Sequence, residues 1–529
     1  MKKIIFLILT LIIASCSEKK DVLEIPLTSD SPEAISILSE ELFFRTNETP
    51  GRINGGQASK INAALKEALE VDPDFNIVKA FLADSDNFLN DSERRSLIES
   101  AYENRNNVSE IEKGLIESIY FNRVNGNKVK AAQILDKLVK DNPEYYYLRI
   151  YNGNFQNFVM QNPKNAETNW KSALEINPNA NIAKLLISQL HFVTTPDFIL
   201  LDSDEIDLNY AIGLIKEVEK IQPNNSTPPR LLGNIYRVSG DFDLSLESYQ
   251  KAMDLTKNKD GLFFSTLYLI SGHVYLFKGE YDKAREYYAK SLEIYDQPFY
   301  STNTSAWSTN SYLYEKKYGK AIIAIDELEK KVNNYDIDDL SKNNLLFRCA
   351  QEKFIAYGHS QMKEETKKVV KDIKEIEKKI KSNRLANISS ESEIRNIELQ
   401  SELNQAFFEI WYNILFGEYQ VARESLRNFS LLSSEFLSYD SKAMINFYKL
   451  SGYLNLMEGN ISQSISFYEQ IPTELLEGDN YQLYFYALAI KANGNTNKSN
   501  ELFDYLANYN FAGWENSIIR PLAKNQIKG

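Results

Sequence analysis

The sequence predicts an all-α protein built of repeated antiparallel helix pairs. From residue 31 onward, amphipathic stretches of about 12–16 residues follow one another, with almost no strand-like alternation. Short groups of Gly, Pro, Asn and Asp separate these stretches and mark the turns between helices. The chain has only 14 prolines and 21 glycines among 529 residues, which also favours helices over an all-β fold.

The first residues predict a targeting leader that is not part of the fold. Lys2 and Lys3 make the first residues basic, and the apolar run that follows has about 11 residues, whereas a bilayer-spanning helix needs about 20. Residues 1–15 are therefore a predicted signal peptide. The stretch at its end, Ile13, Ala14, Ser15 and Cys16, resembles the lipobox of bacterial lipoproteins, in which the cysteine is lipidated and becomes the first residue after cleavage.

This resemblance implies that Cys16 carries acyl chains, palmitate among them, and anchors the chain to a membrane. Residues 16–30 would then be a lipidated tether. Ser17 is not the aspartate that retains enterobacterial lipoproteins in the inner membrane, and residues 17–21 resemble the acidic export tag of surface lipoproteins in Bacteroidetes. The implied location is therefore the envelope of a Gram-negative, Bacteroidetes-like bacterium, at the periplasmic side of the outer membrane or the cell surface. The alternative is an ordinary secretory signal that contains a cysteine. The only other cysteine is Cys349, so no intrachain disulfide is expected.

Two kinds of punctuation indicate a repeat of about 35 residues. Pro73, Pro143 and Pro178 each follow a predicted helix, at intervals of 70 and 35 residues. A glycine followed by a polar residue is expected in the turns between paired helices, because glycine adopts the left-handed conformation that ends a helix. The glycines of this kind are Gly126, Gly153, Gly240, Gly279, Gly417, Gly459 and Gly494.

Units of this length resemble the tetratricopeptide repeat, a helix–turn–helix of about 34 residues. The best match is residues 226–259, and the next is 265–298, where Gly272 is expected at the contact between helices and Tyr288 at a packing position. The motif residues of the first of these repeats are Leu232, Gly233, Tyr236, Gly240, Asp241, Phe242, Tyr249 and Ala252. The resemblance implies a right-handed superhelical solenoid of antiparallel helix pairs.

The remaining segments follow in order. Residues 31–225 are predicted to form degenerate helical repeats, 226–335 the best-matching repeats, 336–402 a long helical hairpin or insertion, and 403–529 the C-terminal repeats. Within the insertion, the stretch 363–383 has an apolar stripe along one helix face, and the rest of that helix is expected to be a solvated outer face. The alternative is a coiled-coil contact with another protein. The stripe consists of Val369, Ile373, Ile376 and Ile380.

Composition and motifs exclude several classes of function. A net charge of −13 and a pI near 5.1 argue against nucleic acid as a partner. The three histidines are far apart, and no HExxH, CxxC or Walker-type loop is present, so neither a metal nor a cofactor is expected. Scattered carboxylates on an acidic helical protein nominate no catalytic pair. The sequence therefore predicts a non-catalytic protein.

The resemblance also implies a concave groove lined by the first helix of each repeat. Carried over to residues 226–259, its groove positions are Arg230, Asn234 and Arg237. In the next two repeats they include His273, Phe277 and Asn310. Asparagine amides can bond the backbone of an extended peptide, and arginines can bind a carboxylate. These residues are the predicted peptide-groove site.

One departure from the family pattern and one alternative interpretation bear on that prediction. The arrangement resembles part of the peptide-terminus clamp of chaperone-binding members of the family, but Ile270 and Trp307 stand where further polar clamp residues would be needed. The alternative is that His273 and the asparagines bond neighbouring helix ends or face water.

Two functions from different classes follow from these features. The first is a membrane-anchored scaffold that binds other envelope proteins or peptide segments. The second is a nutrient- or glycan-binding outer-membrane lipoprotein resembling the SusD family, which is also lipidated and built on tetratricopeptide-like helices. The chain has only 4 tryptophans and lacks that family's loop-rich insertion, which favours the scaffold.

Overall fold

The computed structural model describes residues 25–39, 55–85, 89, 91–192, 198–257, 259, 261–386, 388 and 390–527. All regular secondary structure in these ranges is helical. Within them, no helix combines the length and the hydrophobicity that crossing a bilayer requires. The predicted signal peptide, Cys16 and residues 16–24 of the predicted tether lie outside the described residues.

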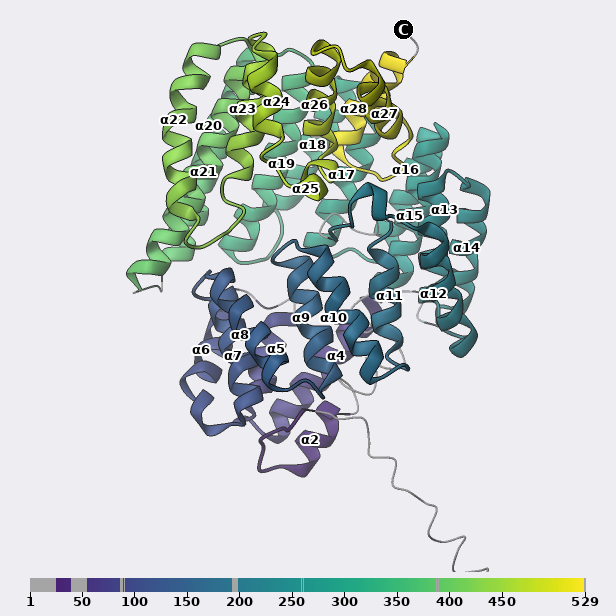
Figure 1. Ribbon diagram of the computed structural model, residues 1–529, viewed down its shortest axis with the longest axis vertical. Coiled ribbons are helices and arrows are strands. Elements are labelled where there is room, and N and C mark those ends of the chain that lie inside the picture. Colours follow the sequence, from purple (N-terminus) through teal and green to yellow (C-terminus); the bar gives the residue numbers. More distant parts are fainter. Residues whose placement is uncertain are drawn as a thin grey trace, which may run out of the picture.

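The N-terminal part of the chain consists of short helices in consecutive pairs (Figure 1). These helices are α2 (Pro32–Leu38), α4 (Gly55–Val71), α5 (Asn76–Ser85), α6 (Asp91–Glu103), α7 (Glu110–Arg123), α8 (Lys128–Asp141), α9 (Tyr146–Phe158), α10 (Pro163–Ile176), α11 (Asn181–Gln189) and α12 (Leu208–Ile221). Two short 3₁₀ turns, η3 (Arg105–Asn107) and η4 (Ser203–Glu205), lie between them.

The central and C-terminal parts continue the same pattern with helices of 5 to 25 residues. They are α13 (Thr227–Ser239), α14 (Phe242–Leu255), α15 (Leu262–Lys278), α16 (Tyr281–Ile294), α17 (Pro298–Tyr314), α18 (Tyr318–Asn333), α19 (Asp339–His359), α20 (Lys363–Leu385), α21 (Glu391–Leu415), α22 (Tyr419–Phe436), α23 (Ile445–Met457), α24 (Ile461–Tyr468), α25 (Thr473–Glu477), α26 (Asn480–Ala492), α27 (Thr496–Asn508) and α28 (Trp514–Ile527). Each pair also contacts the next, so the pairs stack into an α-solenoid.

Small residues opposite large aromatic rings bring the paired helices together. A Cβ atom on Gly272 would lie 2.5 Å from the Tyr288 ring, and one on Gly233 would lie 2.4 Å from the Tyr249 ring. Gly452 faces Tyr468 in the same way, at 2.7 Å. The predicted helix contact at Gly272 is therefore confirmed, and the same device recurs in three pairs.

Six of the seven glycines predicted to lie in turns have the left-handed conformation, and Gly153 does not. Gly240 and Gly279 end α13 and α15 in the left-handed conformation, with φ of 87° and 79°. Gly153 is not a turn residue as predicted. It lies inside α9, where a Cβ would meet the Trp170 indole at 2.3 Å. The left-handed residue after α9 is instead Gln161, with φ of 54°.

The apolar stripe of the stretch 363–383 packs inside the chain. Val369 and Ile373 on α20 are 4% and 0% exposed and belong to the main hydrophobic core, together with residues of α19 and α21. Because this core already covers the stripe, a coiled-coil contact with another protein would have to use a different face of α20.

The C-terminal segment turns back to the inner side of the solenoid. Helix α28, drawn in yellow in Figure 1, packs on its neighbours α26 and α27 and also contacts α17 and α19. The preceding stretch 509–513 is not helical. Its residue Ala512 is buried in one cluster with Phe277 and Tyr288, so this stretch lies against α15 and α16.

Candidate functional site

The six predicted groove residues lie on three successive first helices. Arg230, Asn234 and Arg237 are on α13, whereas His273 and Phe277 are on α15 and Asn310 is on α17. All six are buried, with exposed fractions between 1% and 8%. The structure therefore collects them on one side of neighbouring repeats, but it does not leave them open to solvent.

Two of these residues hold the packing tyrosine of their own repeat. The Tyr249 hydroxyl donates to Asn234 Oδ1 at 2.7 Å, and the Tyr288 hydroxyl lies 2.9 Å from His273 Nδ1. Burial, together with the nearby charge of Arg237, holds the pKa of His273 well below its usual value. His273 is therefore neutral at physiological pH and joins α15 to α16.

Asn310 differs because its repeat has no such tyrosine. The position that corresponds to Tyr249 and Tyr288 is Ile325, which is fully buried. The amide oxygen and nitrogen of Asn310 are both buried and have no hydrogen-bond partner in the described part of the chain. Such a group is costly to bury, since an unsatisfied polar group loses about 1–3 kcal/mol of hydration. This difference is visible in the sequence, because Ile325 stands at the position where the two preceding repeats have Tyr249 and Tyr288.

The two arginines bring buried positive charge to α13. Burial lowers the pKa of Arg230 to about 10, and its guanidinium carbon lies 5.9 Å from the centre of the Phe263 ring. No ion pair joins Arg230 to a carboxylate in the described ranges. Arg237 lies under the Phe511 ring, 5.4 Å from its centre, and donates to the Tyr249 hydroxyl at 3.4 Å.

The C-terminal segment covers this face. Asn510 Nδ2 donates to the carbonyl of Val238 at 3.3 Å, and Arg520 donates to Asn510 Oδ1 at 2.8 Å. The Arg520 guanidinium also stacks on Phe277, 4.8 Å from the ring centre. Sequence reasoning missed this cover. The sequence feature that indicates this cover is an amphipathic stretch after residue 513, which lies beyond the end of the final predicted repeat.

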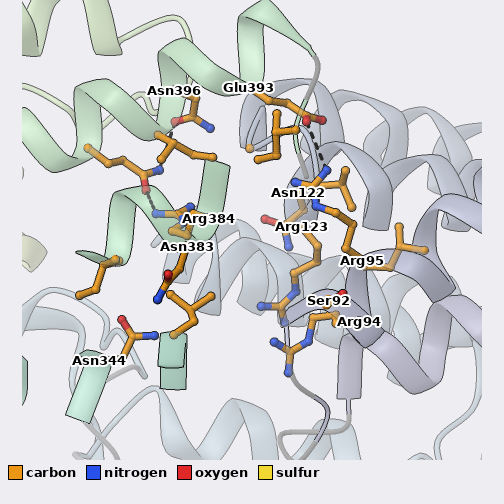
Figure 2. Close-up of a pocket in the computed structure, with 18 of the residues that line it drawn as sticks. Ser92, Arg94, Arg95, Asn122, Arg123, Asn344, Asn383, Arg384, Glu393 and Asn396 are labelled. Carbon is orange, nitrogen blue, oxygen red and sulfur yellow. Dashed lines mark hydrogen bonds and ion pairs between the residues drawn. The ribbon is translucent and has the colours of Figure 1, made fainter. Parts of the chain in front are cut away.

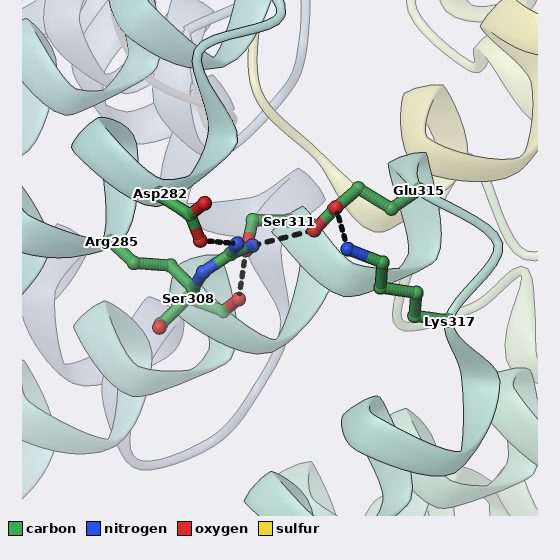
Figure 3. Close-up of polar contacts among 6 residues, drawn as sticks. All are labelled: Asp282, Arg285, Ser308, Ser311, Glu315 and Lys317. Atoms are coloured by element: carbon green, nitrogen blue, oxygen red, sulfur yellow. Dashed lines mark hydrogen bonds and ion pairs between the residues drawn. The ribbon is translucent and has the colours of Figure 1, made fainter.

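A polar network fixes the joint between two of these repeats (Figure 3). Arg285 on α16 donates to Ser311 Oγ at 2.9 Å and to Glu315 Oε2 at 2.8 Å, and it also pairs with Asp282. Lys317 pairs with the other oxygen of Glu315. The network therefore orients α17, which carries Asn310, relative to α15 and α16.

A second recess lies at the inner face of the C-terminal repeats. It is a pocket of about 180 Å³ formed by α19, α21, α23, α26 and the start of α28. Its aromatic wall is a cluster of Trp411, Tyr481 and Trp514, whose ring centres lie 5.3–5.7 Å apart. Its charged lining residues are Arg348, Glu352, Lys449, Asp479 and Glu515.

The carboxyls of this pocket are held in an unfavourable environment. Glu352 is 1% exposed, and burial raises its pKa. Arg348 Nη2 lies 2.8 Å from Glu352 Oε1, yet neither carboxylate oxygen has a well-aligned hydrogen bond, so we regard the contact as an ion pair of poor geometry. Burial, with smaller contributions from Asp479 and Glu352, raises the pKa of Glu515 to about 7.

A larger cavity, of about 610 Å³, lies between α6–α8 and α20–α21 (Figure 2). Five arginine and lysine side chains line the cavity. Carboxylates that line the cavity, or that pair with these side chains from outside it, balance their charge. Arg95 pairs with Glu393 at 3.3 Å, and Lys128 pairs with Asp440 at 3.1 Å. The balancing carboxylates are Asp84, Glu99, Asp338, Glu393 and Asp440. The cavity is thus a joint between the N-terminal and C-terminal repeats without a surplus of charge.

Three carboxylates with metal-like spacing, Asp202, Asp204 and Glu205, lie near η4. Lys164 Nζ lies 2.7 Å from Asp202 Oδ2 and 3.1 Å from Glu205 Oε2. Hydrogen bonds to these two carboxylates raise the pKa of Lys164. The ammonium group therefore occupies the space between two of the three carboxylates, where a metal ion would otherwise bind.

Comparisons with known proteins bear on the central repeats. Residues 227–297 match the tetratricopeptide repeat family, which confirms the resemblance for α13–α16. No curated protein matches the sequence.

Solved structures with similar folds include a tetratricopeptide repeat protein from Parabacteroides merdae (15% identity, 56% of this chain and 92% of the other, TM-score 0.32). The apo form of RapI (14% identity, 79% and 99%, TM-score 0.36) and yeast Tom70 (13% identity, 84% and 86%, TM-score 0.36) are similar to the same low degree. These TM-scores are too low to support a functional argument.

Proposed function

We propose that this protein is a non-catalytic scaffold that grips an extended segment of another envelope protein on the inner face of α13, α15 and α17. One observation carries the proposal. The chain's own stretch 509–513 already lies on this face without helical structure, bonded to the backbone by Asn510 and stacked on Arg237 by Phe511. A surface that accommodates one extended segment can accommodate another in its place.

The chemistry of the face favours an acidic segment. Arg230 brings a buried positive charge that no carboxylate of the described chain balances, and the Asn310 amide has an unused donor and acceptor. A carboxylate near Arg230 and a peptide group near Asn310 would relieve both deficits. The incoming segment would displace residues 509–513, so binding competes with the C-terminal cover.

The anchor completes the proposal. Lipidation at Cys16 would hold the scaffold at the outer membrane, and its partners would be proteins of the envelope. Cys16→Ala should release the protein from the membrane fraction, and unchanged retention would contradict the anchor. The fold and the comparisons give no support to the nutrient-binding alternative.

The test combines cross-linking in intact cells with mass spectrometry of the purified adducts. Arg230→Met keeps an unbranched apolar stem and removes the charge, and it should abolish the adducts formed on α13–α17. Arg427→Met, at an exposed position of α22, is the matched control and should leave them unchanged. Asn510→Ala should increase their yield by loosening the cover. Equal yields from the Arg230 variant and wild type would refute the proposed groove.

A further inference from the structure

We infer that the pocket beneath the start of α28 binds a cationic group on an apolar stem, namely the guanidinium or primary ammonium of a peptide side chain or of a small amine. The pocket lies in other repeats than the groove proposed above. The two sites can therefore be tested separately, and neither depends on the other.

Charge balance is the first argument. The pocket is lined by three carboxyl groups and two cations. Arg348 lies against Glu352, and Lys449 pairs with Asp479 at 2.8 Å. No ion pair connects the third carboxyl, Glu515, to a cation of the described chain. When all five groups are ionised, the pocket lacks one positive charge.

The state of Glu352 is the second argument. Its carboxylate is almost completely removed from water, and Oε2 has no hydrogen-bond donor in the described ranges. A buried carboxylate is stable only when donors or cations replace its lost hydration. A guanidinium or ammonium entering the pocket would bring N–H groups to Glu352 and neutralise Glu515. The ligand would therefore supply what the chain does not.

The walls fit the rest of such a ligand. Trp411, Tyr481 and Trp514 offer aromatic surfaces, which attract cations through their ring quadrupoles. Ile355 and the rings of Phe407 and Phe408 offer apolar surface for a hydrocarbon stem. At about 180 Å³, the pocket is smaller than the roughly 300 Å³ that drug-sized ligands require, so one side chain or one small amine fills it.

The experiment uses the fluorescence of Trp411 and Trp514, two of the 4 tryptophans, in the full-length protein. Butylguanidine, butylamine and the tripeptide acetyl-alanyl-arginyl-alanine amide are titrated in parallel with neutral analogues, namely butylurea, butanol and the citrulline tripeptide. We expect saturable binding of at least one cationic probe, at least tenfold tighter than its neutral analogue. Binding of the small probes alone identifies a free amine as the source, and a preference for the tripeptide identifies a peptide side chain.

Variants localise the effect. Glu515→Gln and Glu352→Gln should each weaken the cationic probe at least tenfold, whereas Glu327→Gln, at an exposed position of α18, should not change its binding. Circular dichroism checks that each variant remains folded. Equal affinity for cationic and neutral probes, no saturable binding by wild type, or unchanged binding by both pocket variants would overturn the assignment. Arg230→Met should leave this binding intact, which separates it from the proposed groove.

Discussion

Replacement of Gly272 by alanine tests the helix-pairing device directly. The new Cβ would lie 2.5 Å from Tyr288 Cε1 and 3.2 Å from the backbone oxygen of Ala284. Neither neighbour can retreat easily, since Tyr288 is 1% exposed and its hydroxyl is bonded to His273. The paired helices α15 and α16 must therefore move apart, or the ring must leave its site.

The expected cost follows from three contributions. Alanine gains up to about 1 kcal/mol over glycine in a helix interior. Overpacking of a filled core costs about 1–3 kcal/mol, and loss of the hydrogen bond between Tyr288 and His273 costs about 0.5–1.5 kcal/mol more. We therefore expect Gly272→Ala to be less stable than wild type by about 0.5–4.5 kcal/mol.

The assay is urea denaturation followed by circular dichroism. The control is Gly213→Ala in the middle of α12, where a Cβ meets nothing within 4 Å, so that variant should gain up to about 1 kcal/mol. The double variant Gly272→Ala with Tyr288→Ile should recover part of the loss, because Thr309 and Ile325 form that kind of pair at the same spacing. A Gly272→Ala protein as stable as the Gly213→Ala protein would refute the reasoning.

Three further predictions concern the C-terminal repeats. Burial raises the folded-state pKa of Glu515 from 4.5 to about 7, so between these pH values the folded protein keeps a proton that the unfolded chain has lost. The stability of wild type therefore falls as the pH rises from 4.5 to 7, whereas Glu515→Gln has no such loss. The urea midpoint of Glu515→Gln should exceed that of wild type by an amount that grows from pH 4.5 to pH 8, and a constant difference would contradict this. The charged groups that face Glu515 are Arg348, Glu352 and Asp479. Cys349 is buried, and burial raises the pKa of its thiol to about 12. In a Cys16→Ser protein at pH 8, iodoacetamide should therefore label Cys349 only after denaturation, because it reacts with the thiolate. Rapid labelling of the folded protein would count against this burial. Arg520→Ala removes buried hydrogen bonds to Ala507 and Asn510 and should destabilise the packing of the C-terminal segment by about 1–3 kcal/mol. Proteolysis in the stretch 509–513 should then be faster than in wild type. Cleavage at the wild-type rate would show that Arg520 does not hold this segment in place.

Local features of this fold could be predicted from the sequence, because they arise within one repeat. Gly272 and Tyr288 are close in the chain, and their spacing alone indicates the contact. The groove positions were also placed on the expected helices. The cover over Arg237 and Phe277 was not predictable in this way, since their partners Phe511 and Arg520 lie far away in the sequence.

The pocket beneath α28 could not be predicted for the same reason. Its lining comes from five helices between α19 and α28, and no short motif contains both Glu352 and Glu515. Gly153 failed as a predicted turn because a glycine serves two purposes in these repeats. It ends helices by its backbone freedom, and it admits a ring such as that of Trp170 by lacking a side chain.

The return of α28 to α17 gives the C-terminal repeats a closed circuit of contacts. In an open array each repeat depends only on its neighbours, so the array can fold from any point and fray from its ends. Here α17 reaches the contacts that the structure describes for it only after α28 has been made. During synthesis, the contact between α17 and α28 can form only after α28 has left the ribosome, whereas the pairs between them can fold earlier. A chain that stops short of Trp514 would leave this circuit open, however well its earlier repeats fold.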